Sequence, residues 1–229
     1  MTLQYSANGR QTVAVYRVGF EVGASDRYVI LGPSGCGKST ILKAVGGYLT
    51  PAEGGILLHG AAVRAPGPDR VFVFQEFDQL LPWKTARENI VFALTASRKM
   101  SRRDAEQRAS DVLDKVNLAA FADHYPHTLS GGMKQRVAIA RALAMEPHVL
   151  LMDEPFAALD ALTRQKMQDE LLQLWEETKF TMLFVTHSIE EAVRVGSRIL
   201  LLSAHPGRVK AEIDCRSADA REIQELLYA

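Results

Sequence analysis

The chain has 229 residues, of which 47% are hydrophobic and 24% charged, and its formal net charge is zero. This length is enough for one large domain with a substantial core. The neutral charge argues against a general electrostatic attraction to nucleic acid or to an anionic membrane surface. No apolar run approaches the roughly 18 residues that cross a bilayer, and the first residues do not resemble a signal peptide, so we expect membrane association only through a partner.

The first 75 residues are predicted to form mostly strands. Apolar residues nearly alternate over 13–22, with a slip after Val15 that indicates a bulge. Short apolar runs predict further strands at 28–31, 56–58 and 71–74.

The hydrophobic period lengthens toward 3.6 residues between about 85 and 145. Ser101, with Asp104 three residues later, is typical of a capped helix start, and an apolar helical face follows over 105–116. This segment is the best candidate for a separate helical lobe.

Strands and helices alternate again after Pro147. Asp160 and Ser188 are predicted to cap two of the helices. The apolar runs lack alternation, as expected of parallel strands that are covered on both faces, and they lie at 149–152, 181–185 and 199–202. Such alternation predicts a doubly wound α/β core.

A glycine-rich segment follows the predicted strand 28–31 and fits the pattern G-x-x-x-x-G-K-[ST]. Its residues are Gly32, Pro33, Ser34, Gly35, Cys36, Gly37, Lys38 and Ser39, and Thr40 continues into the next helix. The glycines let backbone N–H groups turn inward around phosphate oxygens, and a helix N-terminus favours anions. We expect Lys38 to reach the β- and γ-phosphates of a nucleotide and the Ser39 hydroxyl to bind Mg²⁺.

The phosphate loop completes the fold prediction: an α/β fold with a P-loop NTPase (RecA-like) parallel-sheet core, an N-terminal antiparallel β region and an inserted α-helical subdomain. We assign 1–84 and 147–229 to the core lobe and 85–146 to the helical subdomain. The cysteines, Cys36 and Cys215, have no metal-binding spacing and are expected to be reduced thiols. Helix-proximal N–H groups predict a lowered pKa for Cys36.

Two carboxylates end the predicted strand 149–152. Ligand sites in open α/β sheets lie beyond the carboxyl ends of the strands, which is where Asp153 and Glu154 fall. Asp153 is therefore predicted to help bind magnesium, and Glu154 is predicted to be the general base that orients the attacking water. His187 follows the strand 181–185 at the same sheet edge, which favours a contact with the γ-phosphate over a merely structural role.

The segment LSGGMKQR contains a further helix N-terminus, formed by Ser130, Gly131 and Gly132. A serine cap and two glycines can also receive a phosphate. One γ-phosphate does not need two helix N-termini from one chain, so we expect the nucleotide of a neighbouring subunit to dock there.

With this motif the chain resembles the nucleotide-binding subunits of ABC transporters along almost its whole length. The resemblance implies that Ser130, Gly131 and Gly132 grip the ATP held by the opposite protomer. It also implies that Gln75 is the Q-loop glutamine, which links the magnesium site to the permease contact. Asp160 resembles the D-loop aspartate, and Tyr5 is the best-placed aromatic to stack on adenine.

The resemblance further implies the partners. These are a second, identical ATPase subunit in a head-to-tail dimer, integral membrane permease subunits and an extracytoplasmic solute-binding protein, with no nucleic acid. The chain would then lie at the cytoplasmic face of the cell membrane, with ATP and Mg²⁺ as its cofactors. The pair Gln75-Glu76, the segment LLPW at 80–83 and the segment SAHPGR at 203–208 resemble the nitrate/sulfonate/taurine importer branch.

Three apolar residues after the Q-loop have two interpretations. Leu80, Leu81 and Trp83 either pack inside the helical lobe, as most apolar clusters do, or line an exposed groove for a short helix of the permease. The family resemblance favours the groove.

Two other functions are considered. A soluble ABC-type ATPase that acts on nucleic acid or ribosomes usually fuses two ATPase halves or carries a long coiled coil, and this sequence has one half and no heptad array. A P-loop kinase or GTPase lacks the LSGG signature. We therefore expect an ATPase that powers uptake of a small solute through a permease.

Overall fold

The computed structural model describes residues 1–7, 10–75, 77–97, 100–216 and 220–228. Its centre is a six-stranded sheet with the strand order β10-β9-β3-β8-β7-β6. Five strands run parallel, and β10 pairs antiparallel with β9 at one edge. The strands are β3 (Arg27–Leu31), β6 (Arg70–Val73), β7 (Val149–Asp153), β8 (Thr181–Thr186), β9 (Arg198–Leu202) and β10 (Val209–Asp214).

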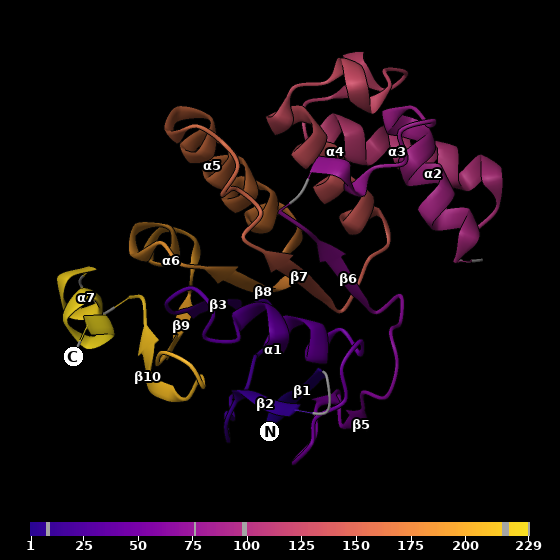
Figure 1. Cartoon of the computed structure of the whole chain (residues 1–229). Helices are drawn as coiled ribbons and strands as arrows, with labels where there is room; N and C mark the ends of the chain where they lie inside the picture. Colours follow the sequence, from indigo (N-terminus) through magenta and orange to yellow (C-terminus); the bar gives the residue numbers. More distant parts are fainter. Residues whose placement is uncertain (8–9, 76, 98–99, 217–219, 229) are drawn as a thin grey trace.

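Helices cover both faces of this sheet (Figure 1). One face packs against α1 (Lys38–Val45), and the other packs against α5 (Ala161–Thr178) and α6 (Ile189–Val195). Alternate residues of β3 enter different cores: Ile30 packs in the cluster that contains α1 residues, and Val29 in the cluster that contains α5 and α6 residues. A strand that is buried on both faces has to be apolar throughout, which explains why its sequence shows no alternation.

The N-terminal region adds two small antiparallel pairs on the α1 side of the sheet. They are β1 (Leu3–Ala7) with β2 (Arg10–Val15), and β4 (Leu57–Leu58) with β5 (Ala61–Ala62). Leu3 pairs with Val15 and Gln4 with Val13, so Ala14 is the extra residue of a bulge, one position before the predicted slip.

The predicted strand over 13–22 is wrong beyond Val15. Arg17 adopts a left-handed backbone conformation, with φ of 50°, which an extended strand does not accommodate. Val18 is nevertheless buried, and its N–H donates to the carbonyl oxygen of Met1. Its apolar character therefore reflects core packing rather than strand pairing.

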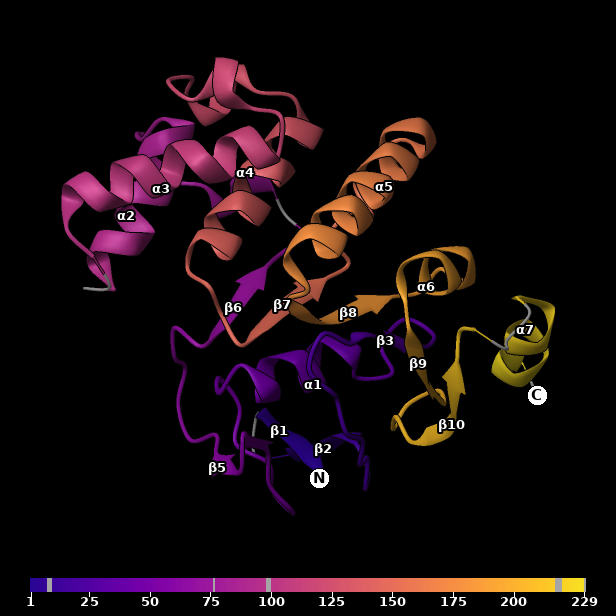
Figure 2. The same cartoon turned by 180° about the vertical axis from the view of Figure 1, so that it is seen from behind.

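Three helices lie between β6 and β7 in the chain and pack against one another beside the β6 edge of the sheet (Figure 2). Ser101 caps α3 by accepting a hydrogen bond from the Asp104 N–H, as predicted. The helices are α2 (Ala86–Ala96), α3 (Arg102–Lys115) and α4 (Gly131–Ala144), with short 3₁₀ turns at Phe77–Gln79, Ala119–Phe121 and Pro126–Thr128. The predicted fold class is confirmed, whereas the lobe boundaries at 84/85 and 146/147 stay predictions.

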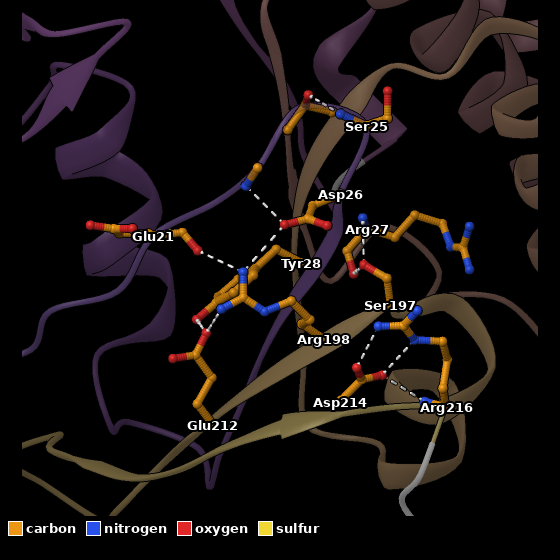
Figure 3. Close-up of polar contacts among 12 residues, drawn as sticks. Glu21, Ser25, Asp26, Arg27, Tyr28, Ser197, Arg198, Glu212, Asp214 and Arg216 are labelled. Atoms are coloured by element: carbon orange, nitrogen blue, oxygen red, sulfur yellow. Dashed lines mark hydrogen bonds and ion pairs between the residues drawn. The ribbon is translucent and has the colours of Figure 1, made fainter.

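The sequence did not predict the C-terminal elements β10 and α7 (Ala220–Tyr228). An ionic cluster fixes β10 to the sheet (Figure 3). The Arg198 guanidinium on β9 forms ion pairs with Asp26 and Glu212, and the Tyr28 hydroxyl donates to Glu212 over 2.8 Å. Burial and the acceptor Glu212 raise the pKa of Tyr28. Within the described part of the chain, no helix combines the length and apolar character that a membrane crossing requires.

Candidate nucleotide-binding and catalytic site

The glycine-rich loop connects β3 to α1 at the carboxyl edge of the sheet. Gly35 and Gly37 have φ values of 77° and 100°, which L-amino acids rarely adopt. A Cβ atom on Gly37 would also lie 2.5 Å from a Val15 methyl carbon and 2.9 Å from the Ala14 carbonyl oxygen. The compact shape of the loop therefore requires glycine at both positions, and Ala14 and Val15 of β2 pack directly against Gly37.

Lys38 lies at the mouth of this loop and is 5% exposed. Its ammonium donates to the carbonyl oxygens of Gly32 and Pro33, over 2.9 and 3.0 Å. The same Nζ atom lies 3.9 Å from Oε1 of Glu154. The structure thus places a buried cation where the loop would hold phosphate oxygens, beside the carboxylate predicted to be the base.

Ser39 and Asp153 form an oxygen-rich pair next to the loop. The Ser39 hydroxyl donates to Oδ1 of Asp153 over 2.8 Å, from α1 to the end of β7. Burial raises the pKa of Asp153, and the hydrogen bond from Ser39 partly offsets this effect. Hydroxyl and carboxylate oxygens are hard ligands of the kind that Mg²⁺ binds together with nucleotide phosphates, so the donor set fits this ion.

Gln75 is less closely connected to that pair. It lies two residues after the end of β6 and is exposed, and the structure gives it no hydrogen bond to Ser39 or Asp153. Its roles in magnesium binding and catalysis therefore stay predictions. Glu76, the other half of the predicted Q-loop pair, lies outside the described residues.

Glu154 and His187 meet at the ends of adjacent strands. Asp153 pairs with Val185 in the β7–β8 register, so Glu154 leaves β7 beside Thr186, the last residue of β8 and the neighbour of His187. Oε2 of Glu154 lies 2.8 Å from Nδ1 of His187. Glu154 has a φ of 45°, a left-handed conformation that clusters at functional sites when non-glycine residues adopt it.

Lys38, Ser39 and Glu154 border one cleft of about 370 Å³, whereas Asp153 and His187 are not among its lining residues. The Tyr5 hydroxyl donates to Oγ1 of Thr40 over 2.9 Å, which holds this partly exposed aromatic ring beside the loop. The predicted adenine contact of Tyr5 remains a prediction. The cleft is lined by Tyr5, Thr12, Ala14, Ser34, Gly35, Gly37, Lys38, Ser39, Thr40, Glu154 and His205.

Sequence reasoning missed His205 as a site residue. The signal was present in the segment 203–208, which was used only to indicate a family branch. The Gly207 N–H donates to the Ala14 carbonyl oxygen and the Gly207 carbonyl accepts from the Tyr16 N–H, which holds this segment at the end of β2, and His205 lines the cleft.

The predicted lowering of the Cys36 pKa is wrong. The thiol is fully buried in the core on the α1 side, and burial raises its pKa. The nearby Lys38 and the loop N–H groups act in the opposite direction but do not prevail. Any contact between Cys36 and a nucleotide would therefore have to come from its backbone, and this stays a prediction.

The signature lies apart from the phosphate loop. Ser130 caps α4, and its hydroxyl accepts from the Met133 N–H, while Gly131 and Gly132 form the first turn. No contact in the described residues joins these three to the cleft. Asp160 caps α5 in the predicted way by accepting from the Thr163 N–H, and this bond lowers the pKa of Asp160.

The apolar trio after the Q-loop divides between core and surface. Leu80 belongs to the buried core, Leu81 is half-buried, and Trp83 is 69% exposed. Phe92, on the neighbouring α2, is also exposed and carries the Lys84 ammonium over its ring. The packing interpretation is therefore correct for Leu80, and a surface role is left open for Trp83.

The chain is similar to ATP-binding proteins of two importers. The taurine import ATP-binding protein TauB of Rhizobium johnstonii is 47% identical over 223 residues, which cover 94% of this chain and 84% of that protein. The nitrate import ATP-binding protein NrtD of Synechococcus elongatus is 45% identical over 202 residues, which cover 88% of this chain and 73% of that protein.

Solved structures have the same fold. The dimeric ATP-binding cassette MJ0796 in a post-hydrolysis state, bound to ADP and Pi, superimposes with a TM-score of 0.80 at 35% identity and covers 95% of this chain and 97% of its own. A family model described as ABC transporter matches residues 15–157, more than half of the chain. This chain therefore belongs to the ABC transporter family.

Proposed function

We propose that this chain is the ATP-hydrolysing subunit of an importer that takes up a small solute of the nitrate, sulfonate or taurine class through a partner membrane permease. The observation that carries the proposal is the position of Glu154, between the Lys38 ammonium at 3.9 Å and the His187 ring at 2.8 Å, directly after Asp153. A base, a cation and a histidine thus converge at the mouth of a phosphate loop, as hydrolysis of a γ-phosphate requires.

The roles follow from these positions. Glu154 orients the attacking water and accepts its proton, and Lys38 and His187 stabilise the charge that develops on the γ-phosphoryl group. Ser39 and Asp153 would hold Mg²⁺, assisted by Gln75, and the bound ion would supply positive charge beside the β- and γ-phosphates. The loop residues 32–40 surround the phosphates, and Tyr5 stacks on adenine. The products are ADP and inorganic phosphate.

Two chains act together in this proposal. Ser130, Gly131 and Gly132 lie away from the cleft of their own chain, which suits contact with a nucleotide that a second chain holds. Asp160, exposed at the start of α5, would lie at the same interface. The arrangement is a head-to-tail dimer of identical chains with two ATP molecules between them, and closing and opening of this dimer drives the permease.

The permease would contact the surface around Trp83, eight residues after the Q-loop glutamine Gln75. This places the chain at the cytoplasmic face of the cell membrane, held there by the permease subunits, while an extracytoplasmic binding protein delivers the solute. In this proposal the segment 85–146 is the helical subdomain that carries the signature, and 1–84 with 147–229 is the core lobe. The named relatives are import proteins, and no observation favours action on nucleic acid or ribosomes.

The assembled complex provides the test. The chain, its permease and its solute-binding protein are reconstituted in vesicles, and ATP hydrolysis is measured with taurine, with nitrate and without solute. We expect one solute to stimulate hydrolysis, and a Lys38→Ala complex to show neither hydrolysis nor stimulation. Hydrolysis that nucleic acid stimulates, with no response to membrane partners, would overturn the proposal.

A further inference from the structure

Glu191 is the one almost fully buried acidic side chain in the described part of the chain, with 7% of its surface exposed. A buried carboxylate is costly unless its oxygens are hydrogen-bonded. Both oxygens of Glu191 have partners: Oε1 accepts from Nε2 of Gln168 over 2.9 Å, and Oε2 accepts from the Thr186 hydroxyl. None of these three residues lines the nucleotide cleft.

The contact with Thr186 fixes the turn that carries His187. A hydroxyl has one proton to donate, and Thr186 gives it to Glu191, so its oxygen is left to accept from the Ser188 N–H, over 3.0 Å. The Glu191 N–H in turn donates to the Ser188 hydroxyl, over 3.2 Å. His187 therefore lies between two residues that are both tied to Glu191.

The contact with Gln168 extends the hydrogen-bond network of Glu191 to the helix α5. Gln168 is buried on α5, the helix that Asp160 caps. The helices α5 and α6 lie on the same face of the sheet (Figure 1). A continuous set of contacts thus runs from α5 through Glu191 and Thr186 to the His187 turn, and from the His187 ring to Glu154.

We propose that Glu191 is a positioning residue for His187: its carboxylate holds the 186–188 turn so that the imidazole faces the reacting phosphate, and Gln168 ties that orientation to α5. The inference rests on the proposed function, because it assumes that His187 acts on the γ-phosphate. A misplacement of about 1 Å in a catalytic group can reduce the rate about 100-fold.

Two substitutions at Glu191 separate geometry from charge. Glu191→Gln keeps both bonds, since its carbonyl can accept from Thr186 and its amide can donate to Gln168 once the Gln168 amide is flipped. Glu191→Leu fills a similar volume but leaves both partners without their acceptor. We expect Glu191→Gln to retain most of the kcat for ATP hydrolysis and Glu191→Leu to lower kcat about 10- to 100-fold, with little change in the KM for ATP.

A double-mutant cycle with His187→Ala then tests whether the effect passes through His187. The rate loss from Glu191→Leu should disappear in the His187→Ala background. Asp169→Asn is the matched control, because it removes an exposed α5–α6 ion pair with Arg194 and should leave kcat unchanged. Thr186→Val provides a second, nearly isosteric route if Glu191→Leu does not fold, and it should give the same rate loss and the same non-additivity.

The results distinguish the positioning role of Glu191 from the proposed function of the chain. If His187→Ala and Glu154→Gln collapse hydrolysis while folded Glu191→Leu and Thr186→Val keep the wild-type kcat, the positioning role is wrong and the proposed function stands. Equal rate losses from Glu191→Leu with and without His187 would show a merely structural effect and also overturn the inference. If His187→Ala itself hydrolyses ATP at the wild-type rate, the assumed role of His187 in the proposed mechanism fails.

Discussion

Gly207 lies so close to the main chain of Cys36 that a Cβ atom there would be 2.1 Å from the Cys36 carbonyl oxygen. Two hydrogen bonds of Gly207 to the end of β2 hold it in this place, one to Ala14 and one from Tyr16. The C-terminal segment 203–208 and the phosphate loop therefore support one another, although they are far apart in the sequence.

Gly207→Ala should force these two segments apart. We expect a loss of about 1–3 kcal/mol of unfolding free energy, the usual cost of overpacking, together with weaker ATP binding because the loop loses its support. Urea unfolding and nucleotide titration would measure the two effects. Gly55→Ala is the matched control, because a Cβ atom there meets nothing within 4 Å. Unchanged ATP affinity in Gly207→Ala would show that the contact does not shape the loop.

Arg136 on α4 and Glu170 on α5 form a second long-range contact, through two N–O pairs of 2.7 and 2.8 Å. Both side chains are largely shielded from water, so their bonds contribute more than those of a surface pair. Glu170→Gln should cost about 1–2 kcal/mol of unfolding free energy. The exposed pair of Arg102 and Glu106 supplies the control: Glu106→Gln should change stability by less than about 0.5 kcal/mol. Equal shifts in the two urea midpoints would contradict this ranking.

The sequence predicted the parts of the site that depend on local signals. The phosphate loop is recognisable because only glycine tolerates its backbone, as Gly37 shows with a φ of 100°. The helix caps Ser101, Ser130 and Asp160 could be predicted because capping is local. Each of these side chains accepts a hydrogen bond from the N–H three residues later. Asp153 and Glu154 were placed by the rule that parallel strands end at one edge of the sheet.

What the sequence did not predict depends on contacts between distant segments. The strand β10 does carry an alternating pattern, VKAEID, that sequence reasoning missed, but its place beside β9 is set by Tyr28 and Arg198, which both contact Glu212. The burial of Cys36 depends on the core cluster that it shares with residues of β2, α1 and the sheet. The link from Gln168 to Glu191 and the approach of His205 to the cleft likewise have no local pattern.

The two cysteines should react slowly with thiol reagents at neutral pH. Burial raises the pKa of both thiols, that of Cys215 to about 11, so at a given pH less of the reactive thiolate is present than in an ordinary cysteine. In a Cys36→Ala variant, the reaction rate of Cys215 should rise about tenfold per pH unit from pH 8 to 10. The urea-unfolded variant is the control, and its rate should level off near pH 9. A plateau near pH 9 in the folded variant would contradict the raised pKa.

Glu154→Gln tests the base, the dimer and the signature together. The amide keeps the shape of the carboxylate and its reach toward His187 but cannot accept the proton of the attacking water. The substitution also removes a negative charge beside the γ-phosphate. ATP should still bind, hydrolysis should fall at least about 100-fold, and the closed dimer should accumulate with ATP but not with ADP, as measured by light scattering.

A second substitution then shows whether the signature holds the nucleotide of the other chain. Ser130→Arg, added to Glu154→Gln, should abolish the ATP-dependent dimer while each chain still binds ATP, because Ser130 lies outside the cleft of its own chain. Replacing a serine cap costs about 1 kcal/mol by itself, so Ser101→Arg, which removes the equally exposed cap of α3, is the matched control and should leave the dimer intact. Loss of ATP binding in the Ser130→Arg variant would place the signature in the site of its own chain. Wild-type hydrolysis by Glu154→Gln in the complex with the permease would exclude Glu154 as the base, because no proton acceptor would then be left at that position.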